Sequence, residues 1–389
     1  MLTRYLSTRA FPPAIIGAAY YWFYWSFVSL YDPFLNVYLM QLGLSGLQVG
    51  ILATILPLLM LIYSPFVATF ADRYGRLRIQ KILVAVWAAL LLLFNLPHTF
   101  WGILPLITLL GVARTPTIAI GDSIVARMAS RHRLNFGSMR LWGSIGFATF
   151  SILGGAVWQQ TGFALMFSAA ALMAVPVILM TARLDEDPLE FGGERPSMRR
   201  LLQDRSLVVL LVVAFLSGIP LVGTYVFGSI TMMAIGGTET HVGLMFGLSA
   251  LTEVPTMLTS RAIIHRLRGA PTLLLSLLVL SLSLIGYGLA TTPWILILAA
   301  AGKGVGYGLF FVTLVQLVDE RAGVWASTAQ SMMNAAMLGL APLLTSPVSG
   351  YIFDRWGSAA LFAGSSTTLF ASALILAWVL RHGWFTTTD

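Results

Sequence analysis

The stretch SPFVATFADRYGRLR, residues 64–78, decides the fold because it ends one apolar run in a compact charged turn and begins another. Gly75 favours a tight turn there. The Asp72 carboxylate and the guanidinium groups of Arg73 and Arg76 can form charge-assisted pairs across such a turn. We therefore expect two membrane helices joined by a loop whose salt bridges latch one conformation. Alternatively, the arginines only mark which side of the membrane the loop lies on.

Composition excludes a soluble globular protein. Of the 389 residues, 58% are hydrophobic and 10% are charged, against about 45–50% and about 25% in soluble domains. Twelve membrane helices of about 20–25 residues would leave roughly 90–150 residues for connections and tails. No sizeable soluble domain fits in that remainder. Cysteine is absent, which excludes disulfides, thiol catalysis and cysteine-ligated metals.

Twelve apolar runs have the length of membrane-spanning helices. They cover residues 12–40, 47–70, 79–97, 100–126, 136–158, 161–183, 206–232, 241–262, 271–291, 293–318, 322–346 and 358–381. The first run is too long for a secretory signal, so we expect it to be retained as a helix.

The polar connection at 184–204 divides these runs into two sets of six. The predicted organisation is an N-terminal six-helix bundle at 1–183, a cytoplasmic linker at 184–204 and a C-terminal six-helix bundle at 205–389. Short stretches near turns also recur at three-helix intervals. These are ADRYGR at 71–76, GGAVWQQTG at 154–162, HRLRGAP at 265–271 and SGYIFDRWG at 349–357. Such repeats are typical of transporters built from duplicated three-helix units.

The distribution of positive charge predicts the topology. Connections after the second, fourth, sixth and eighth runs contain Lys or Arg, whereas those after the first, third, fifth, seventh and ninth contain neither. By the positive-inside rule both termini are cytoplasmic. The net charge of +8 therefore reflects topology, and we expect no nucleic-acid partner. We expect a monomeric integral protein of a bacterial plasma (inner) membrane, with the lipid bilayer as its surroundings.

Six charged residues interrupt the apolar runs, where each costs about 2.5–3.5 kcal/mol unless it has a partner or faces a water-filled cavity. They are Asp32, Arg114, Asp122, Arg140, Glu253 and Lys303. Helical spacing also aligns Tyr21 and Trp25 on the first helix and places Gln330 and Asn334 one turn apart. Polar stripes on several helices predict a shared aqueous cavity.

Each of these residues also has a purely structural interpretation. Asp122 with Arg140, or Glu253 with Lys303, would then be an ion pair that only holds helices together. Arg114 would satisfy backbone carbonyls freed by the following proline. Asp32 would cap a broken helix, the aromatic stripe would be packing, and the two amides would bond neighbouring helices.

The chain resembles the major facilitator superfamily over essentially its full length. The resemblance rests on the twelve spans, the division into two sets of six and the loop at 64–78, in which Ala68 occupies the place usually held by a close-packing glycine. It implies an all-α membrane protein with twelve transmembrane helices in two pseudo-symmetric six-helix bundles. Such proteins transport solutes by alternating access.

A narrower resemblance is to the proton-symporter branch that contains lactose permease, the nucleoside permeases and the 3-phenylpropionate transporter-like proteins. Segment GDSIVARMASRHRLNFGSMRLWGSIGFA at 121–148 is similar to its helix 4–5 segment, in which an acid and an arginine eighteen positions apart bind substrate. Asp122 and Arg140 keep that spacing. LSALTEVP at 248–255 resembles the glutamate-bearing helix 8 of the phenylpropionate group and indicates Glu253.

Two further segments extend this resemblance. WASTAQSMMNAAMLG at 325–339 is similar to helix 11 of the phenylpropionate group. Lys303 resembles a lysine in helix 10 of lactose permease, but the His and Glu that accompany it there are Gly306 and Leu309 here. The coupling acid must therefore lie elsewhere.

We expect a secondary active transporter that carries a small organic solute by proton-coupled symport, the solute being an aromatic or other carboxylate, a sugar or a nucleoside. The alternative is a proton-driven antiporter that exports amphipathic compounds or drugs. An enzyme is not expected, because no metal-ligand cluster, nucleophile–base pair or phosphate loop is present. No catalytic residue, metal or cofactor is therefore expected.

The expected site residues follow from these arguments. The candidates for binding the substrate are Asp122, Arg140, Tyr21, Trp25, Lys303, Gln330 and Asn334. Glu253 is the candidate for the proton-coupling acid, because burial favours its protonated form and a neighbouring Lys303 favours its charged form. Asp32 is the rival for that role.

Overall fold

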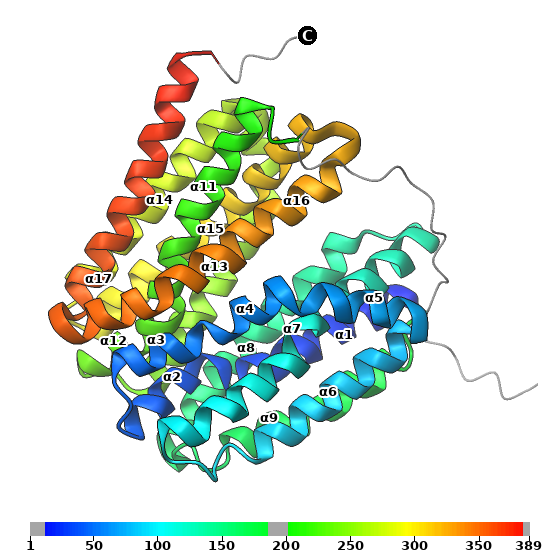
Figure 1. Cartoon of the computed structure of the whole chain (residues 1–389), viewed down its shortest axis with the longest axis vertical. Coiled ribbons are helices and arrows are strands. Elements are labelled where there is room, and N and C mark those ends of the chain that lie inside the picture. The colour runs from blue at the N-terminus through cyan, green and yellow to red at the C-terminus, as the bar shows by residue number, and fades with distance from the viewer. Residues whose placement is uncertain (1–11, 186–200, 384–389) are drawn as a thin grey trace, which may run out of the picture.

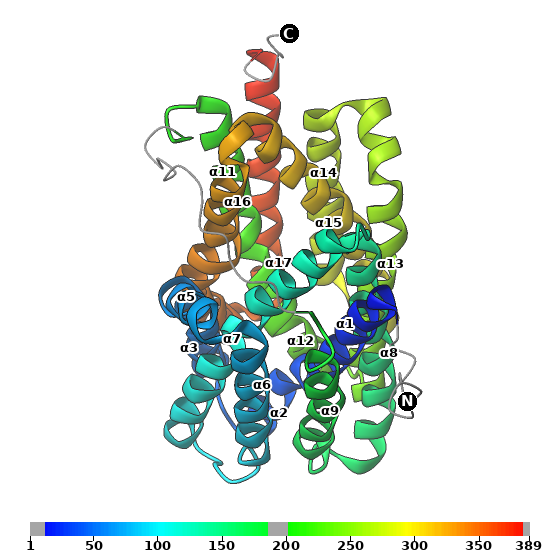
Figure 2. The ribbon, with the colours of Figure 1, turned by 90° about the vertical axis from the view of Figure 1, so that its right-hand side faces the viewer.

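The structure, a computed structural model, describes residues 12–185 and 201–383 of the chain. In these residues every regular element is a helix, and the helices form two bundles, α1–α9 and α11–α17 (Figures 1 and 2). Large apolar side chains such as Phe66 and Leu172 lie on the outside, each 72% exposed. An apolar exterior is the arrangement that a lipid environment selects.

The first bundle contains six helical passages. Its helices are α1 (Pro13–Ser29), α2 (Asp32–Gln41), α3 (Gly46–Ala53), α4 (Ile55–Ile62), α5 (Ser64–Tyr74), α6 (Arg76–Leu92), α7 (Phe100–Arg131), α8 (Phe136–Thr161) and α9 (Met166–Thr181). The run expected as one helix over 12–40 is broken at Leu30 and Tyr31, just before Pro33 in the first turn of α2. Proline lacks the N–H that would continue the helical hydrogen bonds, which accounts for the break.

The second bundle repeats this plan. It contains α11 (Arg205–Val222), the π-helix η1 (Gly223–Phe227), α12 (Gly228–Ala234), α13 (Glu239–Leu267), α14 (Gly269–Leu289), α15 (Pro293–Ala322), the 3₁₀ turn η2 (Gly323–Trp325), α16 (Ala326–Asn334), the π-helix η3 (Ala335–Leu340) and α17 (Ala341–Arg381). Helix α17 includes a sharp turn at Gly357, whose φ of 76° suits glycine. The run expected over 322–346 thus continues to that turn.

These elements make twelve passages in the part of the chain that the structure describes. Seven helical segments are long and apolar enough to cross a membrane alone, and the segment at 46–74, bent by 49°, makes an eighth. Gly357 divides the last of the seven into two passages. The shorter or interrupted helices α1–α2, α6 and α9 complete the set. The expected twelve-helix, two-bundle fold is confirmed.

The bundles meet mainly at one end. We call the end that carries the arginine-rich connections the basic end and the opposite one the far end. Helix α3 packs on α17, and α8 packs on α13, at the far end, whereas α5 and α16 diverge at the basic end (Figure 1). Glycine permits this close approach. A Cβ atom at Gly155 of α8 would lie 2.5 Å from the Glu239 carbonyl oxygen of α13.

A carboxylate completes the far-end contact. Asp354 of α17 accepts hydrogen bonds from the backbone N–H groups of Gly46 and Leu47, both at 2.7 Å. These are unsatisfied donors in the first turn of α3, where the positive end of the helix dipole also favours an anion. One bundle therefore caps a helix of the other.

Substitution of Gly243 should separate the bundles at the far end. Its Cβ atom would collide with the backbone oxygen of Ser151, which cannot move aside as a side chain can. In Gly243→Leu we expect spin labels at Thr161→Cys and Thr291→Cys, both exposed at the far end, to report a longer mean distance. Overpacking of this kind costs about 1–3 kcal/mol where the structure does not yield. Gly364→Leu is the control, because nothing lies within 4 Å of its Cβ position. An unchanged distance in Gly243→Leu would contradict the close packing of α8 on α13.

Candidate substrate cavity

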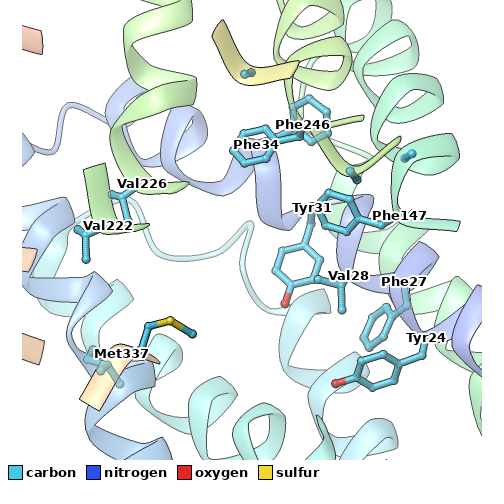
Figure 3. Close-up of a cluster of buried hydrophobic side chains, with 14 of the residues drawn as sticks. Tyr24, Phe27, Val28, Tyr31, Phe34, Phe147, Val222, Val226, Phe246 and Met337 are labelled. Carbon is cyan, nitrogen blue, oxygen red and sulfur yellow. The ribbon is translucent and has the colours of Figure 1, made fainter. Parts of the chain in front are cut away.

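A cavity of about 540 Å³ lies between the two bundles. Both bundles supply apolar walls, including Phe147 of α8 and Phe246 of α13 (Figure 3). Five charged side chains also line it, namely Asp32, Arg114, Arg140, Glu253 and Lys303. In the described residues no group of three His, Cys, Asp or Glu side chains is placed to hold a metal ion. The cavity is suited to an organic ligand that has both an apolar body and a polar group.

Arg140 is held against aromatic rings on the cavity wall. Its guanidinium carbon lies 4.7 Å from the centre of the Trp25 ring and 5.2 Å from that of Tyr21, which is cation–π geometry. Gly143, one turn further along α8, leaves room for this stack, since a Cβ there would lie 2.5 Å from Trp25 Cδ1 and 2.9 Å from Arg140 Nη1. Among the described residues no protein group accepts a hydrogen bond from Arg140, so its planar fork of donors is available to a ligand.

Asp122 lies behind Arg140 instead of on the cavity wall. Tyr21 Oη donates a 2.6 Å hydrogen bond to Asp122 Oδ1, and the ring of the same tyrosine carries the Arg140 guanidinium. The two charges that keep the eighteen-residue spacing are therefore joined through Tyr21, and within the described residues they form no direct ion pair. Of the three, Arg140 lines the cavity, whereas Asp122 and Tyr21 do not.

Glu253 and Lys303 enter the cavity from two closely packed helices. A Cβ at Gly308 of α15 would lie 3.0 Å from the Glu253 carbonyl oxygen of α13, so the helix backbones nearly touch at this level. Both side chains are partly exposed on the cavity wall. Within the described residues neither one makes a hydrogen bond or a direct ion pair. Each therefore has the capacity to bind a proton or a ligand.

Asp32 differs from Glu253 because its carboxylate is fully engaged. Arg114 binds it with two donors, Nη1 to Oδ1 at 2.5 Å and Nη2 to Oδ2 at 3.0 Å. Tyr225 of the opposite bundle donates to Oδ2 at 2.9 Å. The sequence drew attention to Arg114 as an intramembrane charge but not as part of a site, and it gave no signal for Tyr225. A search for aromatic residues near glycine-flanked helix irregularities would have included Tyr225.

Two expected binding residues lie away from the cavity. Gln330 of α16 donates to Asp319 Oδ1 of α15 at 2.5 Å. The side-chain oxygen of Asn334 is buried without a hydrogen-bond partner. Neither residue lines the cavity, and Gln330 joins two helices of its own bundle.

The charged loop at 71–76 lies at the basic end and makes its contacts within the first bundle. Arg76 Nε binds Asp72 Oδ1 at 2.5 Å, and Arg76 Nη1 donates to Ser123 of α7 at 2.9 Å. Gly75 has a φ of 93°, as the expected turn requires, and Arg73 is exposed. In this structure the loop braces α5 against α7.

Two six-helix bundles around a central cavity with unpaired charges define a membrane transporter of the major facilitator fold. The chain belongs to the MFS_1 like family, whose profile matches residues 15–363. It is 28% identical to the maltose permease of Geobacillus stearothermophilus over 366 residues, which are 92% of each chain. It is 22% identical to a probable 3-phenylpropionic acid transporter of Escherichia coli over 360 residues, 88% of this chain and 91% of that one.

The fold also matches a solved transporter. The crystal structure of a variant of the nucleoside transporter NupG superposes with a TM-score of 0.78 at 18% identity, covering 96% of this chain and all of that one. At this identity the match shows the fold alone. The family and the fold together establish an integral membrane transporter and not an enzyme.

Removal of the Tyr21 hydroxyl should destabilise the protein. Tyr21→Phe keeps the ring under Arg140 but leaves the buried Asp122 carboxylate without its donor, which costs about 1–3 kcal/mol. We expect a lower midpoint of thermal unfolding in detergent. Tyr287→Phe is the matched control, because Tyr287 is buried and makes no side-chain hydrogen bond in the described structure. Equal midpoints for the two variants would show that the Tyr21–Asp122 bond contributes nothing.

Proposed function

We propose that this protein imports a small organic solute together with protons by alternating access. The observation that carries the proposal is the cavity itself, which lies between the bundles with the far end packed shut and which contains charged side chains without protein partners. A purely structural set of intramembrane charges would be paired throughout, because an unpaired charge in lipid is costly. Unpaired Arg140, Glu253 and Lys303 are better explained by binding.

Orientation follows from the positive-inside rule. The basic end then faces the cytoplasm, together with both termini, and the far end faces the outside of what we take to be a bacterial inner membrane. With this orientation the structure is the inward-facing state. The two bundles would rock about the cavity so that the far end opens when the basic end closes, as inverted-repeat transporters do. The loop with Asp72, Arg73, Gly75 and Arg76 is proposed to brace the basic end during that motion.

The binding groups favour a solute that is rich in oxygen. The fork of Arg140 can hold two oxygens of a carboxylate or of neighbouring hydroxyls, and the Trp25 ring beside it can pack against a sugar ring or an aromatic ring. The permease for maltose and the probable transporter for 3-phenylpropionic acid among the relatives are consistent with these two classes. Lys303 supplies a second positive charge on the opposite wall. Tyr21 and Asp122 would orient Arg140 from behind.

Glu253 is the better candidate for the proton-coupling acid. Its carboxyl faces the cavity and is free to exchange a proton, and Lys303 is the nearby cation that would favour its charged form. The Asp32 carboxylate is bound on both oxygens by Arg114 and on one by Tyr225, so protonation there would disrupt three hydrogen bonds.

Transport by purified protein in liposomes tests the proposal directly. We expect radiolabelled maltose or 3-phenylpropionate to accumulate when the lumen is made alkaline, and a protonophore to abolish the accumulation. Loss of preloaded solute against an inward proton gradient would instead indicate antiport. Accumulation that ignores the pH gradient would contradict proton coupling.

Arg140→Lys should weaken solute binding at least about tenfold, or about 1.4 kcal/mol. The substitution keeps the positive charge but replaces a planar fork with a single ammonium, so one of two parallel hydrogen bonds is lost. Affinity is measured by the concentration dependence of uptake. Arg266→Lys, at an exposed position near the basic end of α13, is the control. Unchanged affinity in Arg140→Lys would leave the residue with a structural role only.

Glu253→Gln should abolish accumulation while exchange continues. Gradient-driven uptake needs net proton movement, whereas counterflow exchanges solute for solute and does not. We therefore expect Glu253→Gln to retain counterflow and to lose accumulation almost completely. Asp32→Asn is measured beside it. If Glu253→Gln accumulates solute normally and Asp32→Asn only exchanges it, the coupling role belongs to Asp32.

A further inference from the structure

Tyr225 makes a contact across the cavity that neither the binding nor the coupling role explains. It belongs to η1 in the second bundle and donates its hydroxyl to Asp32 Oδ2 in the first bundle at 2.9 Å. Other hydrogen bonds between the bundles, such as those of Asp354 with α3 and of Thr238 with Gln159, lie at the far-end rim. The Tyr225 bond is on the cavity wall itself.

The acceptor of this bond is fixed. Asp32 is 6% exposed and is held by both terminal nitrogens of Arg114. The Arg114 guanidinium in turn lies between the rings of Tyr31 and Trp87, 5.9 and 5.5 Å from their centres. The ion pair therefore moves with the first bundle as one unit. Tyr225 approaches or leaves it only when the second bundle moves.

The donor is presented by an irregular stretch of helix. Residues 223–227 form a single π-helical turn after Pro220, and π-helical turns change the direction in which the following side chains project. The Tyr225 ring packs edge-on against Phe246 of α13, with ring centres 5.5 Å apart. The ring is thus supported within its own bundle, and its hydroxyl alone reaches the other one.

We infer that Tyr225 is a positioning residue that holds the far end closed through Asp32. The inference rests on the proposed function, because it assumes that the bundles separate at the far end during transport. When they separate, the Tyr225 hydrogen bond breaks but the Asp32–Arg114 pair stays intact. Opening therefore costs one charge-assisted hydrogen bond and does not expose an unpaired buried charge. A solute in the cavity contacts Tyr225, which links the occupancy of the site to this closure.

Spin-label distances measure the closure directly, since the chain has no native cysteine. The pair Thr161→Cys and Thr291→Cys reports the far end. In Tyr225→Phe the ring and its Phe246 contact remain, and only the hydroxyl is lost. We expect the ratio of far-end-open to far-end-closed molecules to rise about tenfold, equivalent to about 1.4 kcal/mol. Tyr287→Phe, which removes a buried hydroxyl elsewhere in the same bundle, should leave the ratio unchanged.

A second comparison tests whether the hydroxyl acts through Asp32. In an Asp32→Ala background, Tyr225→Phe should produce no additional shift, because the acceptor is already gone. An equal shift with and without Asp32 would overturn the inference, and so would an unchanged ratio in Tyr225→Phe alone. If Asp32→Ala does not fold, the single variant still decides.

The two proposals fail in different ways. Absence of solute uptake by the wild type in liposomes would count against the proposed function. Normal uptake, with a far-end ratio that does not respond to Tyr225→Phe, would overturn this inference alone.

Discussion

The bidentate ion pair between Asp32 and Arg114 is the interaction on which the arrangement of the cavity depends. Each charge alone would be prohibitive at this depth, and removal of one partner of a buried pair typically costs about 3–5 kcal/mol. Together they attach the start of α2 to the middle of α7. The backbone break at Leu30 and Tyr31 is acceptable at this level because it lies beside a cavity and not in lipid.

The remaining charges divide according to whether they have protein partners. Asp32 and Arg114 satisfy each other, and Asp122 is satisfied by Tyr21. Arg140, Glu253 and Lys303 project toward the cavity with hydrogen-bonding capacity to spare. The full set of six contains three acids and three bases, so the interior is close to neutral as a whole while its accessible part is not. A ligand that enters meets the unpaired charges first, which is the arrangement that a binding site requires.

The sequence predicted the fold well because lipid imposes a simple rule on it. Runs of about 20 apolar residues, separated by connections of alternating charge, leave few alternatives to a bundle of membrane helices. The sequence also identified every charged residue of the cavity wall, since a charge inside an apolar run is conspicuous. Partners were harder to predict. The eighteen-residue spacing of Asp122 and Arg140 suggested a pair, but the packing of α1 places Tyr21 between them.

Contacts that depend on a helix irregularity or on the opposite bundle could not be predicted from periodicity. Tyr225 reaches Asp32 because η1 is a π-helix, and nothing in ordinary 3.6-residue spacing indicates that turn. Gln330 was expected to share a polar face with Asn334, yet its partner is Asp319 on another helix. In both cases the local sequence fixes which side chain is polar, whereas tertiary packing decides which group it meets.

The two ends of the molecule show one sequence motif in two different contacts. Asp72-Arg73-Tyr74-Gly75 at the basic end and Asp354-Arg355-Trp356-Gly357 at the far end share an Asp-Arg-aromatic-Gly order, and both glycines have positive φ. At the far end, where the bundles are packed together, Asp354 caps the first turn of α3 in the opposite bundle. At the basic end, where they diverge, Asp72 binds Arg76 in its own bundle. The same carboxylate position therefore makes a cross-bundle contact only where the opposing helix start is within reach, so the state of each end determines the contact that its motif makes.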